Sequence, residues 1–264
     1  MAALSVSASR PASRARTHGP RLGTRARPEQ TRREILDAAL REFAQEGLAG
    51  ARTDAIARAA GVNKALISYY FGGKSGLYRA ALDQVFSELS QALIAVLERP
   101  LPPREKILAY VGTHFDFMAR APMLPRLIHR EMMQAGRGSN EHVERIAQQY
   151  LQPLFRRLAA VLAEGIASGE FRQVEAAQFA ISMVGAIVHY FASASIVRAI
   201  MRADPYAPER LAARRAAVLD FIAAGLFRSL SDGRARRDEI SANAPPRQKR
   251  ESRKAAKKTK GRRQ

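Results

Sequence analysis

The sequence of 264 residues contains no cysteine, which excludes disulfides, thiolate metal sites and cysteine nucleophiles. It also has no apolar run near its start of the kind that a secretory signal needs. No strand-like alternation of apolar and polar residues persists anywhere, whereas almost everything from 29 to 232 has helical periodicity. The sequence therefore predicts an all-α protein, and its 47% of apolar residues are enough for a sizeable core.

Acidic residues are scarce at both ends of the chain. Residues 1–28 carry six arginines and no acid, and residues 234–264 carry thirteen basic residues against three acids. Only +4 of the net charge of +20 therefore lies between these tails. We expect the tails, 1–28 and 233–264, to be disordered, because their like charges repel and they have little apolar surface to bury. They serve either solubility or the binding of DNA phosphates without sequence preference.

Residues 1–28 share the arginine and serine richness of a transit peptide. Pro11 and Pro28 disfavour the amphipathic helix that such a peptide needs, so we expect a cytoplasmic protein.

Glycine and proline positions divide the middle of the chain into helices. We expect Thr53, Asn63 and Ser75 to be N-caps, since their side chains can accept a hydrogen bond from the first helical turn. The expected helices cover 29–46, 54–60, 64–70, 75–98, 104–119, 125–135, 140–168, 175–202 and 208–231.

One stretch, 176–197, lacks any charged residue and is long enough to cross a bilayer. It contains Gln178, Ser182 and His189, and many of its apolar residues are alanine. A helix that is apolar nearly all round also suits a buried core or a subunit interface. We expect a buried helix and no membrane partner.

The segment GGKS, at 72–75, looks like the end of a phosphate-binding loop. The full pattern G-x-x-x-x-G-K-S/T would place its first glycine at position 68, where the chain has Ser68. Such a loop also follows a strand, whereas this segment follows a predicted helix. The five histidines show no pair at metal-ligand spacing on one helix. We therefore expect no enzyme activity, no metal and no cofactor.

The stretch TDAIARAAGVNKALISYYFG, at 53–72, fits a helix-turn-helix. Ala57 is small enough for two helices to cross, and Gly61 supplies the positive φ of the turn. The residues expected to face the core between the two helices are Ile56, Ala60, Val62, Ile67 and partly Tyr70. The outward face of the second helix then holds a small, polar, basic and aromatic set that could enter a major groove: Asn63, Lys64, Ala65, Ser68 and Tyr69.

Residues 31–85 resemble the N-terminal domain of TetR/AcrR-type bacterial transcriptional regulators. The matching pieces are ILDAALREFAQEG, TDAIARAAGV, YYF, and Lys74 followed by Leu77. The family usually reads V-S-x-G-T-L-Y-Y-H-F-x-x-K where this chain reads V-N-K-A-L-I-S-Y-Y-F-G-G-K. The departures lie at groove-facing positions, so they affect base preference rather than fold.

The resemblance implies a role for each matching residue. Arg52 and Thr53 would contact a phosphate at the start of the second helix, and Lys74 would hold a phosphate at the start of the fourth. The bases or the backbone would be contacted by Asn63, Lys64, Ala65, Tyr69 and Tyr70. Two alternatives remain open: Tyr70 as a core residue and Lys64 as a merely solvated charge.

The rest of the bundle, within 75–232, is expected to bind an effector and to dimerise, as the resemblance implies. A stripe of aromatics and methionines is either core or the wall of a ligand pocket. Its candidate residues are His114, Phe115, Met118, His129, Met132, Tyr150, Phe155, Met183 and His189. The helix 208–231, together with 175–202, is expected to form half of a four-helix dimer interface through Val218, Leu219, Ile222 and Leu226.

These observations predict a three-helix helix-turn-helix domain at 29–74, joined by a long helix to a C-terminal helical bundle. The expected function is that of a homodimeric, nucleoid-associated bacterial regulator, a repressor released or re-oriented by a small molecule. Its partners would be double-stranded DNA and an unknown effector. The alternative is a tail-dominated, non-specific nucleoid-type DNA-binding protein.

Overall fold

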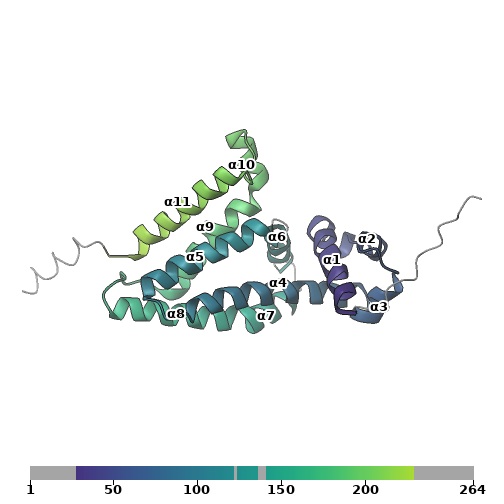
Figure 1. Cartoon of the computed structure of the whole chain (residues 1–264), viewed down its shortest axis with the longest axis horizontal. Coiled ribbons are helices and arrows are strands. Elements are labelled where there is room, and N and C mark those ends of the chain that lie inside the picture. The colour runs from purple at the N-terminus through teal and green to yellow at the C-terminus, as the bar shows by residue number, and fades with distance from the viewer. Residues whose placement is uncertain (1–27, 122–123, 136–140, 229–264) are drawn as a thin grey trace, which may run out of the picture. The chain divides into compact units, whose positions relative to one another are not determined.

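The structure, a computed structural model, describes residues 28–121, 124–135 and 141–228 (Figure 1). Within these ranges the regular structure is helical, apart from one bridge between Phe171 and Phe227. The chain forms two compact units, Met1–Gln84 (unit 1) and Val85–Gln264 (unit 2). The all-α class is confirmed, and both basic tails lie outside the described residues.

Unit 1 consists of α1 (Pro28–Gly50), α2 (Thr53–Ala59), α3 (Ala65–Phe71) and the first turns of α4 (Lys74–Leu97). Each helix contributes large apolar side chains to one core, in which the rings of Phe43 and Tyr78 meet edge to face at 4.8 Å. The start of α4 thus belongs to the core of unit 1. The side chains that fill this core are Ile35, Leu36, Phe43, Ile56, Ile67, Leu77, Tyr78 and Leu82.

The helix starts in unit 1 differ in part from those expected. The Asn63 Oδ1 accepts a hydrogen bond from the Ala65 N–H at 2.8 Å, so its capping role is confirmed. Thr53 is already the first residue of α2, and Ser75 lies inside α4, so neither is an N-cap. The start of α2 is fixed instead by the Glu42 carboxylate, which accepts from the Arg52 N–H at 3.0 Å.

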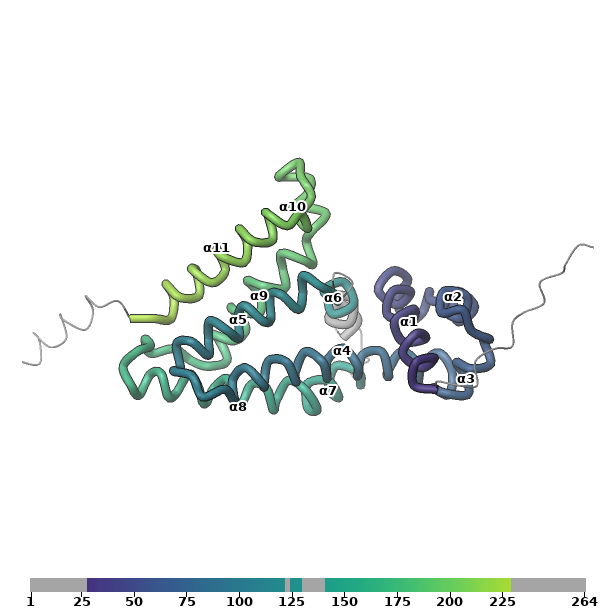
Figure 2. The backbone as a smooth tube through the Cα atoms, viewed as in Figure 1, coloured from purple at the N-terminus to yellow at the C-terminus, as the bar shows by residue number. Residues whose placement is uncertain are grey.

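Unit 2 contains the later part of α4, α5 (Pro103–Arg120), α6 (Leu124–Ala135), α7 (Glu141–Ile146), the π-helical segment η1 (Ala147–Leu151), α8 (Gln152–Ala167), α9 (Ala176–Ala192), α10 (Ala194–Met201) and α11 (Pro208–Leu226). The helices α5, α9 and α11 pack side by side (Figure 2). Just after α4, Glu98 accepts a hydrogen bond from the Arg157 Nε of α8 at 2.8 Å.

The expected helix 140–168 is interrupted by the π-helical segment η1. Pro153 lies in the first turn of α8 and has no N–H, and its ring crowds the carbonyl four residues before it. A wider π turn at this place relieves the crowding. Ser90, buried on α4, donates to the Tyr150 carbonyl oxygen at 3.2 Å, so one backbone acceptor of η1 is satisfied from outside.

The uncharged stretch 176–197 was expected to form one helix. It forms parts of two helices, α9 and α10, which meet at 69°. The break falls at Ser193, whose Oγ donates to the His189 carbonyl oxygen at 2.6 Å. Bonding of this kind back to the preceding turn bends helices. By length and composition, α4 or the bent pair α9–α10 could cross a membrane, a test that buried core helices also pass.

The last described helix, α11, ends at Leu226 rather than at 231, because Phe227 is extended and pairs with Phe171. The Leu226 carbonyl oxygen accepts from the Arg172 N–H at 2.9 Å. The rings of Phe171 and Phe227 stack at 5.4 Å. The Phe171 ring occupies the space that a side chain at Gly165 would need, so this glycine lets the ring lie on the backbone of α8.

Candidate nucleic-acid interface and effector unit

The helices α2 and α3 cross over a small buried core, as the sequence predicts. Ile56, Ala57 and Ile67 are at most 4% exposed, and Val62 is half-buried. The turn between the helices closes through a hydrogen bond from the Val62 N–H to the Ala57 carbonyl oxygen at 2.9 Å. Gly61 has a φ of 67°, the left-handed conformation for which a glycine was expected there. This arrangement is a helix-turn-helix.

The outward side of α3 carries the residues expected to meet DNA. Asn63, Lys64, Ala65 and Ser68 are exposed, and Tyr69 is 78% exposed. Tyr70 is half-buried, and its ring lies edge-on to the Tyr69 ring at 5.0 Å. The two tyrosines therefore differ: Tyr69 projects from the surface, while Tyr70 contributes both to packing and to this face.

Lys64 has a partner that the sequence reading missed. Its ammonium group lies 3.0 Å from the carboxylate of Asp54 in the first turn of α2, and both side chains are more than half exposed. The two residues are ten positions apart, so no helical spacing links them. The pair holds the lysine at the start of α3, beside the α2–α3 turn.

Two other residues that were expected to contact DNA make hydrogen bonds within the chain. The Lys74 ammonium group donates to the carbonyl oxygens of Ala49 at 3.0 Å and Ala51 at 2.8 Å. These two hydrogen bonds close the end of α1. The side-chain Oδ1 of Asn63 caps α3. Arg52 is exposed and Thr53 half-buried at the start of α2. Lys74 therefore has a structural role besides the phosphate contact that the resemblance implies.

The GGKSG segment forms the sharp turn from α3 into α4. Gly72 ends α3 with a φ of 69°. At Gly76 a side chain would collide with the Phe71 carbonyl oxygen, because the first turn of α4 presses against the end of α3. The phosphate-loop pattern of the sequence thus marks a helix-helix turn, and Gly76, which the sequence reading did not single out, is essential to it.

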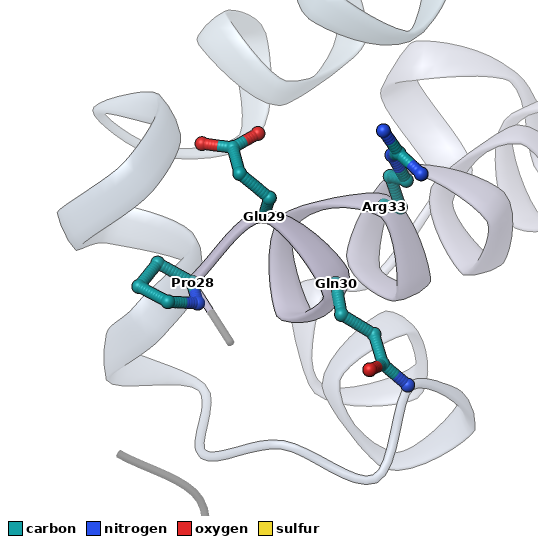
Figure 3. Close-up of a pocket in the computed structure, with 4 residues that line it drawn as sticks. All are labelled: Pro28, Glu29, Gln30 and Arg33. Atoms are coloured by element: carbon teal, nitrogen blue, oxygen red, sulfur yellow. The ribbon is translucent and has the colours of Figure 1, made fainter. Parts of the chain in front are cut away.

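An open hollow lies on the first turns of α1, lined by Pro28, Glu29, Gln30 and Arg33 (Figure 3). All four residues come from one helix, and Glu29 and Gln30 point to opposite sides of its turn (Figure 3). The hollow is therefore a surface feature of α1 and does not have the walls of an enclosed ligand site.

In unit 2, four of the expected pocket residues are buried on two helices that pack together. His114, Phe115 and Met118 on α5 and Met183 on α9 are at most 4% exposed. The His114 Nδ1 has no hydrogen-bond partner among the described residues, and burial lowers the pKa of this imidazole to about 4. The ring of Tyr110 lies edge-on to it at 6.1 Å. His114 is therefore a neutral polar group inside an apolar interior.

The other expected pocket residues do not join this group. His129, Phe155 and His189 are exposed, Tyr150 is half-buried, and the side chain of Met132 lies outside the described part of the chain. Helical geometry gives the reason on α9, where Met183, Ile187 and Phe191 form the buried stripe. His189 follows Ile187 by two residues and so lies on the opposite side of the helix.

The expected dimer residues are also mostly interior. Val218, Ile222 and Leu226 are at most 3% exposed and face the chain's own core, and Leu219 is half-buried. They follow each other at four-residue intervals, the period of a face packed on neighbouring helices. The large apolar side chain that α11 exposes is Phe221, at 65%, and α9 exposes Ile181 at 66% and Val184 at 39%. The apolar stripe of α11 therefore packs inside the chain, and a dimer role for these residues stays a prediction.

Comparison with known proteins covers both units. The family model described as "Bacterial regulatory proteins, tetR family" matches residues 35–81, which include the helix-turn-helix. The model described as "Tetracyclin repressor-like, C-terminal domain" matches residues 103–222. The chain belongs to the TetR family. The TetR family is one of bacterial transcriptional regulators with a DNA-binding helix-turn-helix, and it is not a family of enzymes.

Two curated relatives of this TetR-family regulator are similar over part of their length. The HTH-type transcriptional repressor SCO4008 of Streptomyces coelicolor is 34% identical over 134 residues, 51% of this chain and 64% of the relative. The HTH-type transcriptional regulator BetI of Brucella anthropi is 41% identical over 85 residues, 32% of this chain and 44% of the relative. The chain thus aligns with less than two thirds of either relative.

Solved structures of the family share the fold. KstR2 of Mycobacterium tuberculosis superposes with a TM-score of 0.60 at 16% identity, covering 78% of this chain and 98% of that protein. FadR of Bacillus subtilis, solved with stearoyl-CoA, gives 0.58 at 22%, covering 73% and 98%. PfmR of Thermus thermophilus gives 0.57 at 21%, covering 74% and 99%. At these identities the likeness concerns the fold alone.

Proposed function

We propose that this TetR-family regulator is a homodimeric, nucleoid-associated repressor whose affinity for its operator is set by a small molecule bound in unit 2. The observation that carries the proposal is the outward side of α3, where polar and aromatic side chains project from a helix held on a buried helix-turn-helix core. A helix of this kind reads base edges in the major groove.

Residues at the start of α3 would read the bases. Lys64 can donate to guanine, and the free amide N–H of Asn63 and the hydroxyl of Ser68 can donate at base edges. Tyr69 would reach a phosphate or a base from its exposed position, and Arg52 and Thr53 would hold the backbone at α2. Ala65, which is small, would let the helix approach closely or contact a thymine methyl group.

Dimerisation is supported by the apolar side chains left exposed on two neighbouring helices, Ile181 and Val184 on α9 and Phe221 on α11. Gly185 and Gly225 are exposed beside them, and neither would meet a neighbouring atom if it had a side chain. An apolar face with such openings accepts the side chains of another helix. A second copy would supply them and double the number of bases read.

An effector role for unit 2 is supported by His114, a buried histidine nitrogen without a partner among the described residues, beside Phe115 and Met118. A ligand that binds one arrangement of the dimer more tightly than another shifts the population between them. The SCO4008 relative is a transcriptional repressor, which supports repression as the outcome.

The test is selection of genomic fragments by the purified protein, followed by binding assays with the selected duplex and a scrambled duplex at one salt concentration. The expected result is a fragment with two-fold symmetric half-sites, bound at least a thousandfold more tightly than the scrambled duplex. Equal affinity for both duplexes would instead support the tail-dominated alternative.

The dimer is tested by Phe221→Glu, which places a charge on the exposed apolar face. We expect this variant to sediment as a monomer and to bind the selected duplex more weakly. Ala160→Glu, at an exposed position of α8, is the matched control and should leave both properties unchanged. A dimeric Phe221→Glu variant would place the interface elsewhere.

A further inference from the structure

The start of α1 lies beside the end of α3. The Arg32 guanidinium, in the second turn of α1, lies 5.4 Å from the centre of the Phe71 ring. The Phe71 ring is 6.3 Å from that of Tyr70, which meets the ring of the exposed Tyr69 at 5.0 Å. Four neighbouring side chains therefore connect the outward side of α3 with the first turns of α1 (Figure 2).

The first turn of α1 is open to solvent. Pro28, Glu29 and Gln30 are exposed, and so is Arg32. Pro28 precedes Arg32 by about one helical turn, roughly 6 Å along the helix axis. The chain therefore enters unit 1 at an exposed point close to the helix that is proposed to occupy the major groove.

The segment that leads to this point is rich in arginine. Residues 21–27, which precede the described residues, read RLGTRAR, and residues 1–27 contain no acid. We call residues 21–27 the N-terminal arm. Arg25 and Arg27 are two positions apart, so both would lie on one side of an extended segment. The residues next to them are small, which suits a segment that must enter a narrow groove.

The arm is long enough to reach the minor groove beside α3. Seven extended residues span at most about 25 Å, whereas the major groove is about 12 Å wide and the minor groove about 6 Å. Arginine is attracted to a narrow minor groove because the negative potential is enhanced there. A·T pairs offer this groove acceptors only, whereas guanine adds a donor that opposes a guanidinium. N-terminal arms of homeodomains contact DNA in this way.

We propose that the N-terminal arm places Arg25 and Arg27 in the minor groove, next to the part of the major groove that α3 reads. Arg32 would contact the phosphate backbone between the two grooves. This inference rests on the proposed function and deepens it, because it adds to the operator an A·T-rich element that α3 does not touch.

The test is a binding titration of the full chain with variants of the selected duplex at one salt concentration. The half-sites stay unchanged, and about five base pairs beside each of them, half a helical turn, are made A·T, G·C or inosine·cytosine. The outer and inner sides of the half-sites are changed separately. An inosine·cytosine pair lacks the guanine amino group, so its minor-groove face resembles A·T and its major-groove face resembles G·C.

We expect A·T and inosine·cytosine neighbours on one side of the half-sites to be bound more tightly than G·C neighbours. The expected difference is roughly fivefold or more, the lower end of what one wrong base pair costs. Equal behaviour of A·T and inosine·cytosine would identify the minor groove as the surface that is read.

Two double variants with the same loss of charge locate the contact. Arg25→Gln with Arg27→Gln should abolish the neighbour preference, while the discrimination between selected and scrambled half-sites remains. That remaining discrimination shows that unit 1 of the variant is folded. Arg262→Gln with Arg263→Gln, in the other basic tail, is the matched control and should keep the neighbour preference.

The proposal is overturned if the full chain binds A·T and G·C neighbours equally, or if inosine·cytosine behaves as G·C. It is also overturned if Arg25→Gln with Arg27→Gln weakens binding to all three duplexes by one factor, since that result describes a phosphate contact without sequence preference. Discrimination between half-sites without a neighbour preference contradicts the arm alone. A neighbour preference without discrimination between half-sites contradicts the proposed function and supports the arm.

Discussion

The Lys64 ammonium group lies 3.0 Å from the Asp54 carboxylate, so the lysine at the start of α3 is held by the first turn of α2. Replacing Lys64 by alanine should weaken operator binding by about 1–3 kcal/mol if the lysine reads a base. Asp54→Asn should instead raise affinity for random duplexes, since it removes a negative charge from the DNA-facing surface, and so reduce discrimination. Both variants are measured on the selected and scrambled duplexes at one salt concentration. Unchanged affinities in the Lys64 variant would show that the lysine reads no base and serves only its pair with Asp54.

Tyr69 is so exposed that it contributes little to folding, and its side chain is available to DNA. Tyr69→Ala should leave the free energy of unfolding within about 0.5 kcal/mol of the wild type. Its operator affinity should fall by about 1–3 kcal/mol. Tyr69→Phe, compared in the same gel-shift titration, shows whether the hydroxyl or the ring makes the contact. A loss of stability equal to the loss of affinity would assign the residue to packing.

Lys74 closes the end of α1 through two carbonyl oxygens. Because hydrogen bonds from a charged donor contribute more than neutral ones, Lys74→Met should lower the free energy of unfolding by about 1–3 kcal/mol. Arg79→Met, an exposed change on the same helix, is the control for loss of a positive charge. Urea unfolding without DNA makes the measurement. Undiminished stability together with weaker DNA binding would leave only a phosphate contact for Lys74.

Gly76 has no room for a side chain beside the Phe71 carbonyl oxygen. Gly76→Ala must displace backbone at the α3–α4 turn, and we expect a loss of stability of about 1–3 kcal/mol with weaker operator binding. Gly50→Ala is the matched change, since its new methyl group would meet only the side chain of Glu46 at 3.3 Å. Thermal unfolding of the two variants compares them directly. Equal midpoints would mean that α4 can move away from α3 at little cost.

His114 makes the free energy of unfolding depend on pH. Burial lowers its pKa to about 4, so between pH 6.5 and 4 the unfolded chain binds a proton that the folded chain does not. Stability is therefore intact above pH 6.5 and falls as the pH decreases, by about 2–3 kcal/mol from this group at pH 4.5. His114→Gln should remove this part of the fall in urea unfolding at pH 7.5 and 4.5. His129→Gln, at an exposed position, should keep it.

The sequence was sufficient where local pattern decides the structure. The helical period, Gly61 and the small Ala57 define the helix-turn-helix, and the structure places Ile56 and Ile67 in its core as expected. The exposed side of α3 follows directly, because residues that do not face this core must face solvent. The Asn63 cap was also predictable, since its hydrogen bond spans only two residues.

Features that depend on contacts far apart in the chain were not predictable. No spacing rule connects Asp54 with Lys64, or Phe171 with Phe227, whose pairing ends α11 early. The burial of Val218 and its neighbours inside the chain itself was not predictable for a related reason. A helix with one strong apolar stripe and a single large apolar residue exposed on its other side, Phe221, gives no local sign of which face meets a partner.

Within the π-helical segment η1, one residue can be deleted while the buried face of the helix that follows keeps its orientation. A π turn holds one residue more than an α turn, so deletion of one residue from Ala147–Leu151 can be absorbed by tightening to an ordinary helix. The same deletion near Leu158 would rotate everything after it by about 100°, turning the buried Val161 toward solvent. The segment has the form that a single-residue insertion leaves in a helix, and homologues that lack one residue here would keep the same α8 face.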